Sequence, residues 1–162
     1  MIPNSNSGAS SKIRPATSED VAAIFALERS IPSAAHWPES TYRDIFAQEG
    51  PKRIALVATD QVGKTHDAIC GFVVARIISG DCELENIFVG SQNQHRGLGS
   101  LLLQSLAAAA RIHNASRIFL EVRESNAAAR ALYEKCGFAL TGRRPNYYTD
   151  PIENAVLYTL QL

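Results

Sequence analysis

The sequence has no excess of charge of either sign, because its 16 basic and 16 acidic side chains cancel at pH 7. Without net charge, no overall field draws the chain to nucleic acid or to an anionic membrane. The sequence also lacks any apolar run near the ~20 residues of a membrane-spanning helix. Its serine- and asparagine-rich start has no apolar block typical of a signal peptide. We therefore expect a cytoplasmic protein with neither a nucleic-acid nor a membrane partner.

Cysteine is scarce, with three residues that are widely spaced along the chain. Neither these cysteines nor the four histidines show the short paired spacings that bind zinc or that define a disulfide framework. The sequence therefore predicts buried, reduced thiols and no metal site.

The size and composition of the chain fit one globular domain, with 162 residues of which 46% are hydrophobic and 20% charged. No internal repeat or linker indicates a second domain. We expect residues 1–11 to form a mobile tail and residues 12–162 to form a single domain. No long exposed apolar surface can be inferred from the pattern, so a monomer is the default expectation.

The pattern of apolar residues predicts a mixed sheet with helices. Three β-rich runs separated by polar turns predict an antiparallel meander. After them, helices and strands alternate, and this order requires a parallel crossover. The expected strands are 13–16, 53–59, 69–78, 82–89, 117–123, one from Phe138 and 155–161, and the expected helices are one capped by Thr17 or Ser18 and ending at Glu28, then 39–48, 98–113 and 125–135.

The most informative stretch runs from Gln94 to Gly99, a polar loop with two glycines between a predicted strand and a predicted helix. Glycine has no Cβ, so ligand atoms can approach the backbone closely at Gly97 and Gly99. The N–H groups of the first turn of the helix have no partner inside the helix, and they carry the positive end of its dipole. This arrangement fits a pyrophosphate.

Two interpretations of this loop compete. A dinucleotide-binding fingerprint would explain Gly97 and Gly99, and Glu121 follows them at about the expected separation of ~20 residues. However, Leu102 occupies the place of the third glycine, and a polar stretch, 91–96, separates the strand from the first glycine. The loop more closely resembles the coenzyme A pyrophosphate loop of the GCN5-related N-acetyltransferase superfamily, written Gln/Arg-x-x-Gly-x-Gly/Ala, at every specified position.

A second segment, from Leu120 to Phe138, strengthens this resemblance. It reads Leu-Glu-Val-Arg-Glu-Ser-Asn-Ala-Ala-Ala-Arg-Ala-Leu-Tyr-Glu-Lys-Cys-Gly-Phe, and it is similar almost residue for residue to the ribosomal-protein alanine N-acetyltransferases of the RimI type. The resemblance implies an α/β (α+β) GNAT fold. That fold has a mixed, mostly antiparallel sheet of about six or seven strands, about four flanking helices, and splayed parallel strands that form the cofactor cleft.

The resemblance also implies acetyl-coenzyme A (acetyl-CoA) as the cosubstrate and no metal. The pantetheine arm is expected on the backbone of the splayed strand at Ile87, Phe88 and Val89, whose side chains we assign to the core. Asn126, whose simplest role is to cap the following helix, is expected to contact coenzyme A as well. The residues implied for the diphosphate are Gln94, His95, Arg96, Gly97, Leu98, Gly99 and Ser100, with His95 contributing its backbone.

Acyl transfer from a thioester to an amine needs a neutral amine, a stabilised carbonyl oxygen and a proton for the departing thiolate. Glu121 is expected at the C-terminal end of a strand, on the face that it shares with Phe119 and Arg123. From its position alone, a solvated glutamate paired with Arg123 is the simpler interpretation. The resemblance instead implies that Glu121 is the general base.

Tyr133 is the general acid toward the coenzyme A sulfur in the same resemblance, and it also belongs to the implied cofactor site. At its ordinary pKa of ~10 the phenol is protonated at neutral pH, and a thiolate with a pKa of ~8.5 can take its proton. The alternative for Tyr133 is a core aromatic side chain with its hydroxyl at the surface.

Glu83 is a rival for the role of base. It lies six residues before Val89, the position used by histone-lysine-type members of the superfamily, and we expect it to share a strand face with Glu85 and Ile87. The sequence does not decide between Glu83 and Glu121 without the resemblance.

The acceptor side is implied by the paired tyrosines Tyr147 and Tyr148, which in the family grip the backbone of a peptide N-terminus. Trp37 lies on a loop that we expect over the substrate side. The chain departs from the family pattern here, because Pro145 is inserted before Asn-Tyr-Tyr.

The resulting hypothesis is an acetyl-CoA-dependent N-acetyltransferase that acts on the N-terminal α-amine of a protein, such as a ribosomal protein, by direct attack in a ternary complex. An α-amine with a pKa of ~8 is about one-tenth neutral at pH 7, whereas lysine at ~10.4 is well under ~1% neutral. The alternatives are a small-molecule amine acetyltransferase and a non-catalytic acyl-CoA sensor. The presence of both Glu121 and Tyr133 favours an enzyme.

Overall fold

The computed structural model describes residues 11–62 and 66–162. Within these ranges, seven strands form one mixed sheet, accompanied by four α-helices and two short 3-10 helices. The strands are β1 (Lys12–Pro15), β2 (Arg53–Val62), β3 (His66–Ile78), β4 (Asp81–Val89), β5 (Arg117–Arg123), β6 (Ala139–Thr149) and β7 (Ile152–Gln161), and the helices are η1 (Ser18–Asp20), α1 (Val21–Arg29), α2 (Glu39–Asp44), η2 (Ser91–Asn93), α3 (Leu98–Ile112) and α4 (Ala127–Lys135).

The strand order is β1-β2-β3-β4-β5-β7-β6, and every described neighbouring pair is antiparallel except β4 and β5. The expected mixed, mostly antiparallel sheet and its parallel crossover through α3 are therefore confirmed. Of the predicted tail, residues 1–10 lie outside the described residues. Ser11 is described, and its hydroxyl donates a hydrogen bond to the Asp60 carboxylate.

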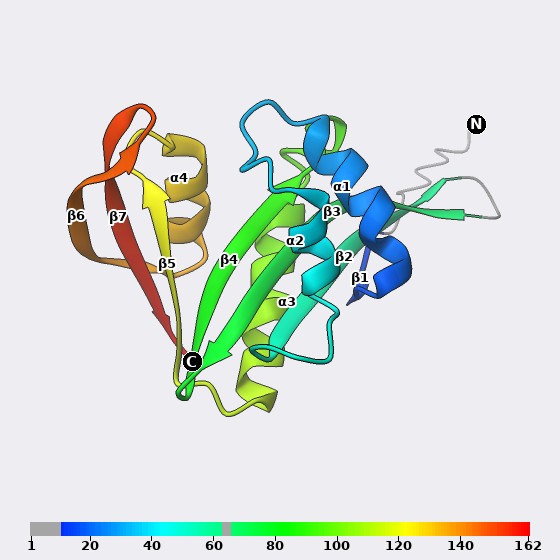
Figure 1. Ribbon diagram of the computed structural model, residues 1–162, viewed down its shortest axis with the longest axis horizontal. Helices are drawn as coiled ribbons and strands as arrows, with labels where there is room; N and C mark the ends of the chain where they lie inside the picture. The colour runs from blue at the N-terminus through cyan, green and yellow to red at the C-terminus, as the bar shows by residue number, and fades with distance from the viewer. Residues whose placement is uncertain (1–10, 63–65) are drawn as a thin grey trace, which may run out of the picture.

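Helices cover both faces of the sheet (Figure 1). On one face, α1 and α2 pack around the buried rings of Tyr42 and Phe72. On the other face, α3 contributes Leu98, Leu102 and Leu106 to a larger cluster. Their spacing of four residues forms a single apolar stripe, and burying each leucine stabilises the fold by about 1.5–3 kcal/mol.

The observed elements differ from the predicted ones mainly at their ends. The second helix ends at Asp44 rather than at residue 48, because the chain continues in tighter i+3 turns, with hydrogen bonds from Phe46 N–H to Arg43 and from Ala47 N–H to Asp44. The hairpin of β2 and β3 extends beyond the predicted strands. β5 has the predicted bounds.

The strands β4 and β5 begin side by side and then diverge (Figure 1). Within the described chain they pair only at Cys82–Ile118 and Glu83–Phe119. Just beyond these pairs β4 contains a β-bulge, where Glu85 is an extra residue between two consecutive pairs with β3. A bulge bends a strand and increases its twist, so β4 turns away from β5.

The bulge also corrects one expectation about side-chain direction. Regular alternation would place Glu83 and Ile87 on one face, but Ile87 packs with the α3-side cluster that also contains Cys82 and Leu84. The extra residue at Glu85 reverses the alternation along the rest of β4. The predicted shared face is therefore wrong for Ile87, whereas Glu83 and Glu85 both lie within 4.0 Å of the Arg76 side chain, at 2.6 and 3.9 Å.

The hairpin of β6 and β7 accommodates the inserted proline. Between the pairs Arg144–Ala155 and Tyr148–Glu153, the three β6 residues at positions 145 to 147 face Asn154 alone. The extra length therefore forms a bulge that includes Tyr147 and bends the edge strand directly before Tyr148. In the part of the chain that the structure describes, no helix has the length and apolar character needed to cross a membrane.

Candidate active site

A cleft with a volume of about 790 Å³ lies where β4 and β5 separate. Its walls come from the second half of β4, the loop and first turn of α3, the end of β5, one face of α4 and the loop after α1. The strand splay therefore brings segments from almost the whole chain to one hollow. Both Glu121 and Tyr133 line it.

At one end of this cleft, the start of α3 presents main-chain N–H groups. Gly97 precedes the helix with φ of 79° and ψ of 5°, a left-handed conformation that glycine adopts without strain. The N–H of Leu101 donates to the Gly97 carbonyl at 3.0 Å. By helix geometry, the N–H groups of Leu98, Gly99 and Ser100 precede this ladder and are free for an anion, and all three residues line the cleft.

Gly99 also faces the neighbouring helix α4. A Cβ at this position would lie 2.9 Å from Cδ2 of Leu132 on α4. The absence of a side chain therefore allows α3 and α4 to pack closely beside the cleft.

Several side chains of the loop before α3 bind back to the sheet. The Arg96 guanidinium lies 2.6 Å from Oδ2 of Asp60, and Asn93 Nδ2 donates to the same oxygen at 3.0 Å. Gln94 Nε2 donates to the Val89 carbonyl at 3.2 Å. Gln94 and His95 line the cleft, whereas Arg96 is turned toward Asp60. The sequence interpretation missed Asp60 altogether.

The middle of the cleft is bordered by the backbone of β4. As predicted, the side chains of Ile87, Phe88 and Val89 belong to the two core clusters. Because β5 has diverged at this level, the β4 edge that faces it is open to the cleft. An extended ligand can hydrogen-bond to such a strand edge as an added strand would.

Glu121 lies on the half-buried face of β5, which alternates with the buried residues as predicted. Its carboxylate pairs with Nε of Arg144 at 3.1 Å. A hydrogen bond to Glu121, together with its negative charge, raises the pKa of Tyr147. The Arg144 side chain of β6 thus orients the carboxylate at the cleft.

The simple pairing of Glu121 with Arg123 is not found. Arg123 instead pairs with Glu153 at 3.2 Å, donates to the Asp150 carbonyl at 2.9 Å, and lies 4.1 Å from the centre of the Tyr148 ring. Arg123 therefore fixes the tip of the β6–β7 hairpin and leaves Glu121 to Arg144.

Glu83 occupies a different position from Glu121. It pairs with Arg76 at 2.6 Å, at the level where β4 and β5 are still hydrogen-bonded. Glu85 and Glu121 are the glutamates among the residues that line the cleft, and Glu85 accepts two hydrogen bonds from Arg53, at 2.7 and 3.2 Å. The geometry favours Glu121 over Glu83 as a base.

Tyr133 is 5% exposed, and its ring packs against Phe138 and Tyr158 at centroid distances of 5.7 and 6.0 Å. Burial, with a smaller contribution from Tyr148, raises the pKa of Tyr133. The hydroxyl therefore keeps its proton at neutral pH and is able to donate a hydrogen bond.

Asn126 forms the predicted helix cap, since its Oδ1 accepts a hydrogen bond from Ala129 N–H at 3.1 Å. It also lines the cleft. The capping role and a position beside the cleft therefore coexist.

The three aromatic side chains expected at the acceptor side occupy different places. Tyr148 lines the cleft, whereas Tyr147 is 47% exposed beside Arg144. The Trp37 ring packs against Tyr42, with 5.7 Å between the ring centres, in the cluster below α1 and α2. Trp37 is not among the residues that line the cleft. The loop before Trp37 forms the wall, with lining residues Ile31, Ser33, Ala34 and Ala35.

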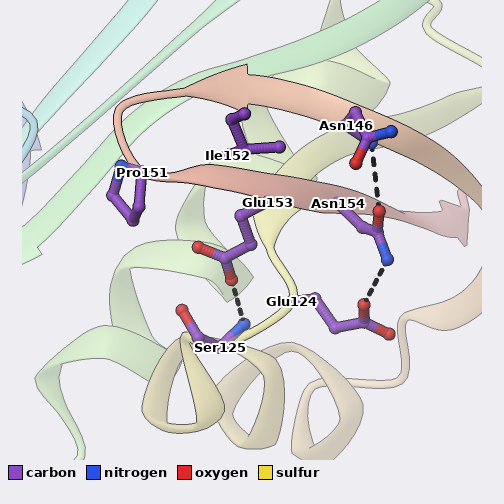
Figure 2. A pocket seen from close by; sticks show the side chains of 7 residues that line it. All are labelled: Glu124, Ser125, Asn146, Pro151, Ile152, Glu153 and Asn154. Atoms are coloured by element: carbon purple, nitrogen blue, oxygen red, sulfur yellow. Dashed lines mark hydrogen bonds between the residues drawn. The ribbon is translucent and has the colours of Figure 1, made fainter.

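A second hollow, with a volume of about 690 Å³, lies between the β6–β7 hairpin and the start of α4 (Figure 2). Its polar groups are already engaged with one another. Glu153 accepts a hydrogen bond from Ser125 N–H. Asn154 Nδ2 donates to Glu124 at 2.8 Å, and Asn154 Oδ1 accepts from Asn146 N–H at 3.0 Å. These contacts join the β6–β7 hairpin to the residues between β5 and α4.

Among residues 11–62 and 66–162, no group of three or more His, Cys, Asp or Glu side chains could hold a metal ion. The three cysteines are free thiols. Burial raises the pKa of both Cys70 and Cys82 to about 11. These two groups are therefore protonated at neutral pH and belong to the core.

Comparison with known proteins identifies similar chains over most of this length. The acetyltransferase (GNAT) family profile matches residues 20–138. The [ribosomal protein bS18]-alanine N-acetyltransferase of Salmonella typhimurium is 32% identical over 145 residues, which cover 88% of this chain and 92% of that protein. The crystal structure of the Escherichia coli ribosomal-protein-S18-alanine N-acetyltransferase has a TM-score of 0.79 and 31% identity, over 94% of each chain. A Bacillus anthracis chain solved in complex with acetyl coenzyme A has a TM-score of 0.63 and 27% identity, over 75% of this chain and 68% of that one.

Proposed function

This chain belongs to the GNAT acetyltransferase family, and we propose that it transfers the acetyl group of acetyl-CoA to the N-terminal α-amine of a protein. The observation that carries the proposal is a single cleft, which connects the N–H groups at the start of α3 with Glu121 and Tyr133. In direct attack, no group on the protein carries the acetyl group between the substrates. The amine and the thioester must therefore meet in one continuous cleft.

The described residues fit acetyl-CoA along the length of the cleft. The N–H groups of Leu98, Gly99 and Ser100 suit the diphosphate, since the start of a helix favours negative charge. The open edge of β4 suits the amide groups of the pantetheine arm. When bound there, acetyl-CoA supplies the thioester to the part of the cleft between β5 and α4.

Glu121 is proposed to accept the proton that the attacking amine loses, directly or through one water molecule. As the new C–N bond forms, the C–S bond breaks and the sulfur departs with its electron pair. Arg144 holds the Glu121 carboxylate in place. The proton of the amine thus ends on the Glu121 carboxylate, and the negative charge ends on the departing thiolate.

Tyr133 is proposed to donate a hydrogen bond to the departing sulfur. A thiol has an ordinary pKa of ~8.5, below that of a phenol at ~10, and burial raises the pKa of Tyr133 further. Complete transfer of the phenolic proton is therefore uphill. Stabilisation of the developing thiolate by the neutral hydroxyl is the role that the burial supports.

An α-amine is the acceptor that this site serves with least proton transfer, because about one-tenth of it is neutral at pH 7 when its pKa is ~8. The similar bacterial enzymes are named for the alanine of ribosomal protein bS18, so we propose a ribosomal protein as the acceptor class. Tyr148 and the loop from Ser33 to Ala35 enclose the acceptor end.

The test is a panel of acceptors incubated with labelled acetyl-CoA. It includes a peptide with a free N-terminal alanine, the same peptide with a blocked N-terminus and an internal lysine, and small polyamines. We expect labelling of the free alanine peptide and, for the blocked peptide, a rate lower by about 100-fold or more, because far less lysine is neutral. A preference for polyamines would establish a small-molecule enzyme, and protection against heat by acetyl-CoA without any transfer would establish a sensor.

Replacing Gly97 by alanine is expected to weaken coenzyme A binding by about tenfold, because alanine strains this left-handed conformation and the resulting shift of the loop misplaces the N–H groups. A side chain in this left-handed conformation also lowers the free energy of unfolding by about 1–2 kcal/mol. Gly80→Ala is the matched control, since Gly80 has φ of 86° in an equally open turn away from the cleft. Calorimetric titration should show weaker binding for Gly97→Ala alone, and equal affinities of the two variants would contradict the assignment.

A further inference from the structure

The loop before α3 is attached to the sheet by a carboxylate that the proposed chemistry does not use. Asp60, near the end of β2, is 8% exposed. We propose that Asp60 is a positioning residue that sets the shape of the diphosphate-binding loop, with the ligand's identity resting on the proposed function. Asp60 acts through Arg96 and Asn93.

Both oxygens of the Asp60 carboxylate are occupied. Oδ2 accepts hydrogen bonds from Arg96 Nη1 at 2.6 Å and from Asn93 Nδ2 at 3.0 Å. Oδ1 accepts a hydrogen bond from the Ser11 hydroxyl. The carboxylate therefore joins two points of the loop, three residues apart, to the sheet and to the chain before β1.

The first part of the loop has its own attachment. Cys70 is an extra residue in β3 opposite the Ala58–Thr59 step, and its carbonyl accepts a hydrogen bond from Gly90 N–H at 2.8 Å. This contact fixes the point where β4 ends, and Gln94 Nε2 holds the middle of the loop through its hydrogen bond to the Val89 carbonyl at 3.2 Å. Asp60 supplies the attachment to β2 directly before Gly97.

Arg96 is the residue through which the effect on binding passes. It immediately precedes Gly97, so its position determines where the N–H groups of the first turn of α3 point. Its guanidinium faces Asp60 instead of the cleft. The structure thus assigns Arg96 to shaping the loop, while the backbone binds the anion.

Hydrogen bonds from Ser11 and Arg96 lower the pKa of Asp60, against the opposing effect of burial. Because the folded pKa lies below the ordinary value, the carboxylate is ionised at neutral pH and keeps its ion pair with Arg96. Asparagine at this position preserves the shape but removes the charge.

Asp60→Asn is therefore expected to raise the Kd of coenzyme A about tenfold in calorimetric titration, through misplacement of the loop. At saturating acetyl-CoA, kcat and the KM of the acceptor should stay within about twofold of the wild type, since the acceptor end of the cleft is untouched. Arg96→Met should raise the Kd by a similar factor. The double variant should be no worse than either single one, because both changes remove the same contact.

Asp81→Asn is the matched control. It removes an ion pair with Arg117, at 2.8 Å, where β4 and β5 begin far from the loop, and it should leave the Kd unchanged. Asp60→Glu keeps the charge and should restore part of the affinity. These two variants separate an effect of the loop from a general loss of stability.

A Kd in Asp60→Asn and Arg96→Met that equals the wild-type value would overturn the inference. A lower Kd in Asp60→Asn would also overturn it, by showing that a released Arg96 binds the phosphates directly. The wild-type titration tests separately whether coenzyme A binds at all, as the proposed function requires. The inference about Asp60 concerns only the ratio of the variant Kd to the wild-type Kd. The Arg96 side chain is 39% exposed, so its replacement disturbs the fold less than a change at Asp60. If Asp60→Asn fails to fold, Arg96→Met therefore still provides the test.

Discussion

Glu121→Gln is expected to lower kcat/KM by about 100- to 10,000-fold, the range that loss of a positioned general base produces. Glutamine has nearly the same shape, but it cannot take a proton from the attacking amine. It also loses the ion pair with Arg144, which is partly exposed and contributes little to stability. Steady-state rates with acetyl-CoA and a free alanine peptide, together with a titration by coenzyme A, measure the two effects separately. Coenzyme A binding should be unchanged.

Glu83→Gln is the control for this prediction, because it removes a glutamate that is paired with Arg76 at the closed end of the splayed strands. Its activity should stay within about threefold of the wild type, since it makes no contact with the reacting groups. If Glu83→Gln abolished turnover and Glu121→Gln did not, the base would be Glu83.

Tyr133→Phe is expected to reduce kcat by about 100-fold, because it removes the hydrogen bond to the departing thiolate. Phenylalanine keeps the ring contacts with Phe138 and Tyr158, so the variant should fold normally. The hydroxyl is needed in its protonated form, and burial raises its pKa. The wild-type kcat should therefore show no alkaline decline from this group up to a pH of about 10, the ordinary pKa of a phenol.

Tyr158→Phe is the matched control from the same aromatic cluster. The Tyr158 hydroxyl donates a hydrogen bond to Glu134 at 2.5 Å and accepts one from Arg130 at 3.2 Å, and neither partner lines the cleft. Its removal should lower the free energy of unfolding by about 1 kcal/mol and leave kcat unchanged. An unchanged kcat in Tyr133→Phe would show that the Tyr133 hydroxyl serves only packing.

The order of helices and strands was predictable from local sequence patterns. The alternation along Arg117–Arg123 and the four-residue spacing of leucines from Leu98 are consequences of strand and helix geometry, and they need no knowledge of distant residues. The glycine loop before α3 and the cap at Asn126 are also local features. They were visible for the same reason.

Features that depend on pairing between distant residues were not predictable. A bulge at Glu85 follows from the register of β4 against β3, and it reversed the expected direction of Ile87. The pairing of Arg96 with Asp60 joins residues 36 positions apart. Arg144 similarly reaches Glu121 only because β6 folds back beside β7.

In the candidate site, too, some residues were predictable from the sequence and others were not. Its most informative residues, Glu121 and Tyr133, were proposed from a resemblance, and both line the cleft. Trp37 was assigned from its loop, but a large aromatic ring gains more by packing against Tyr42 than by facing solvent. Loop residues are harder to place because no periodicity fixes their direction.

A crystal structure of the complex with acetyl-CoA tests the account most directly. We predict the diphosphate on the N–H groups of Leu98, Gly99 and Ser100, and the thioester between Glu121 and Tyr133. A diphosphate bound at any other part of the surface, or a thioester out of reach of both side chains, would contradict the account.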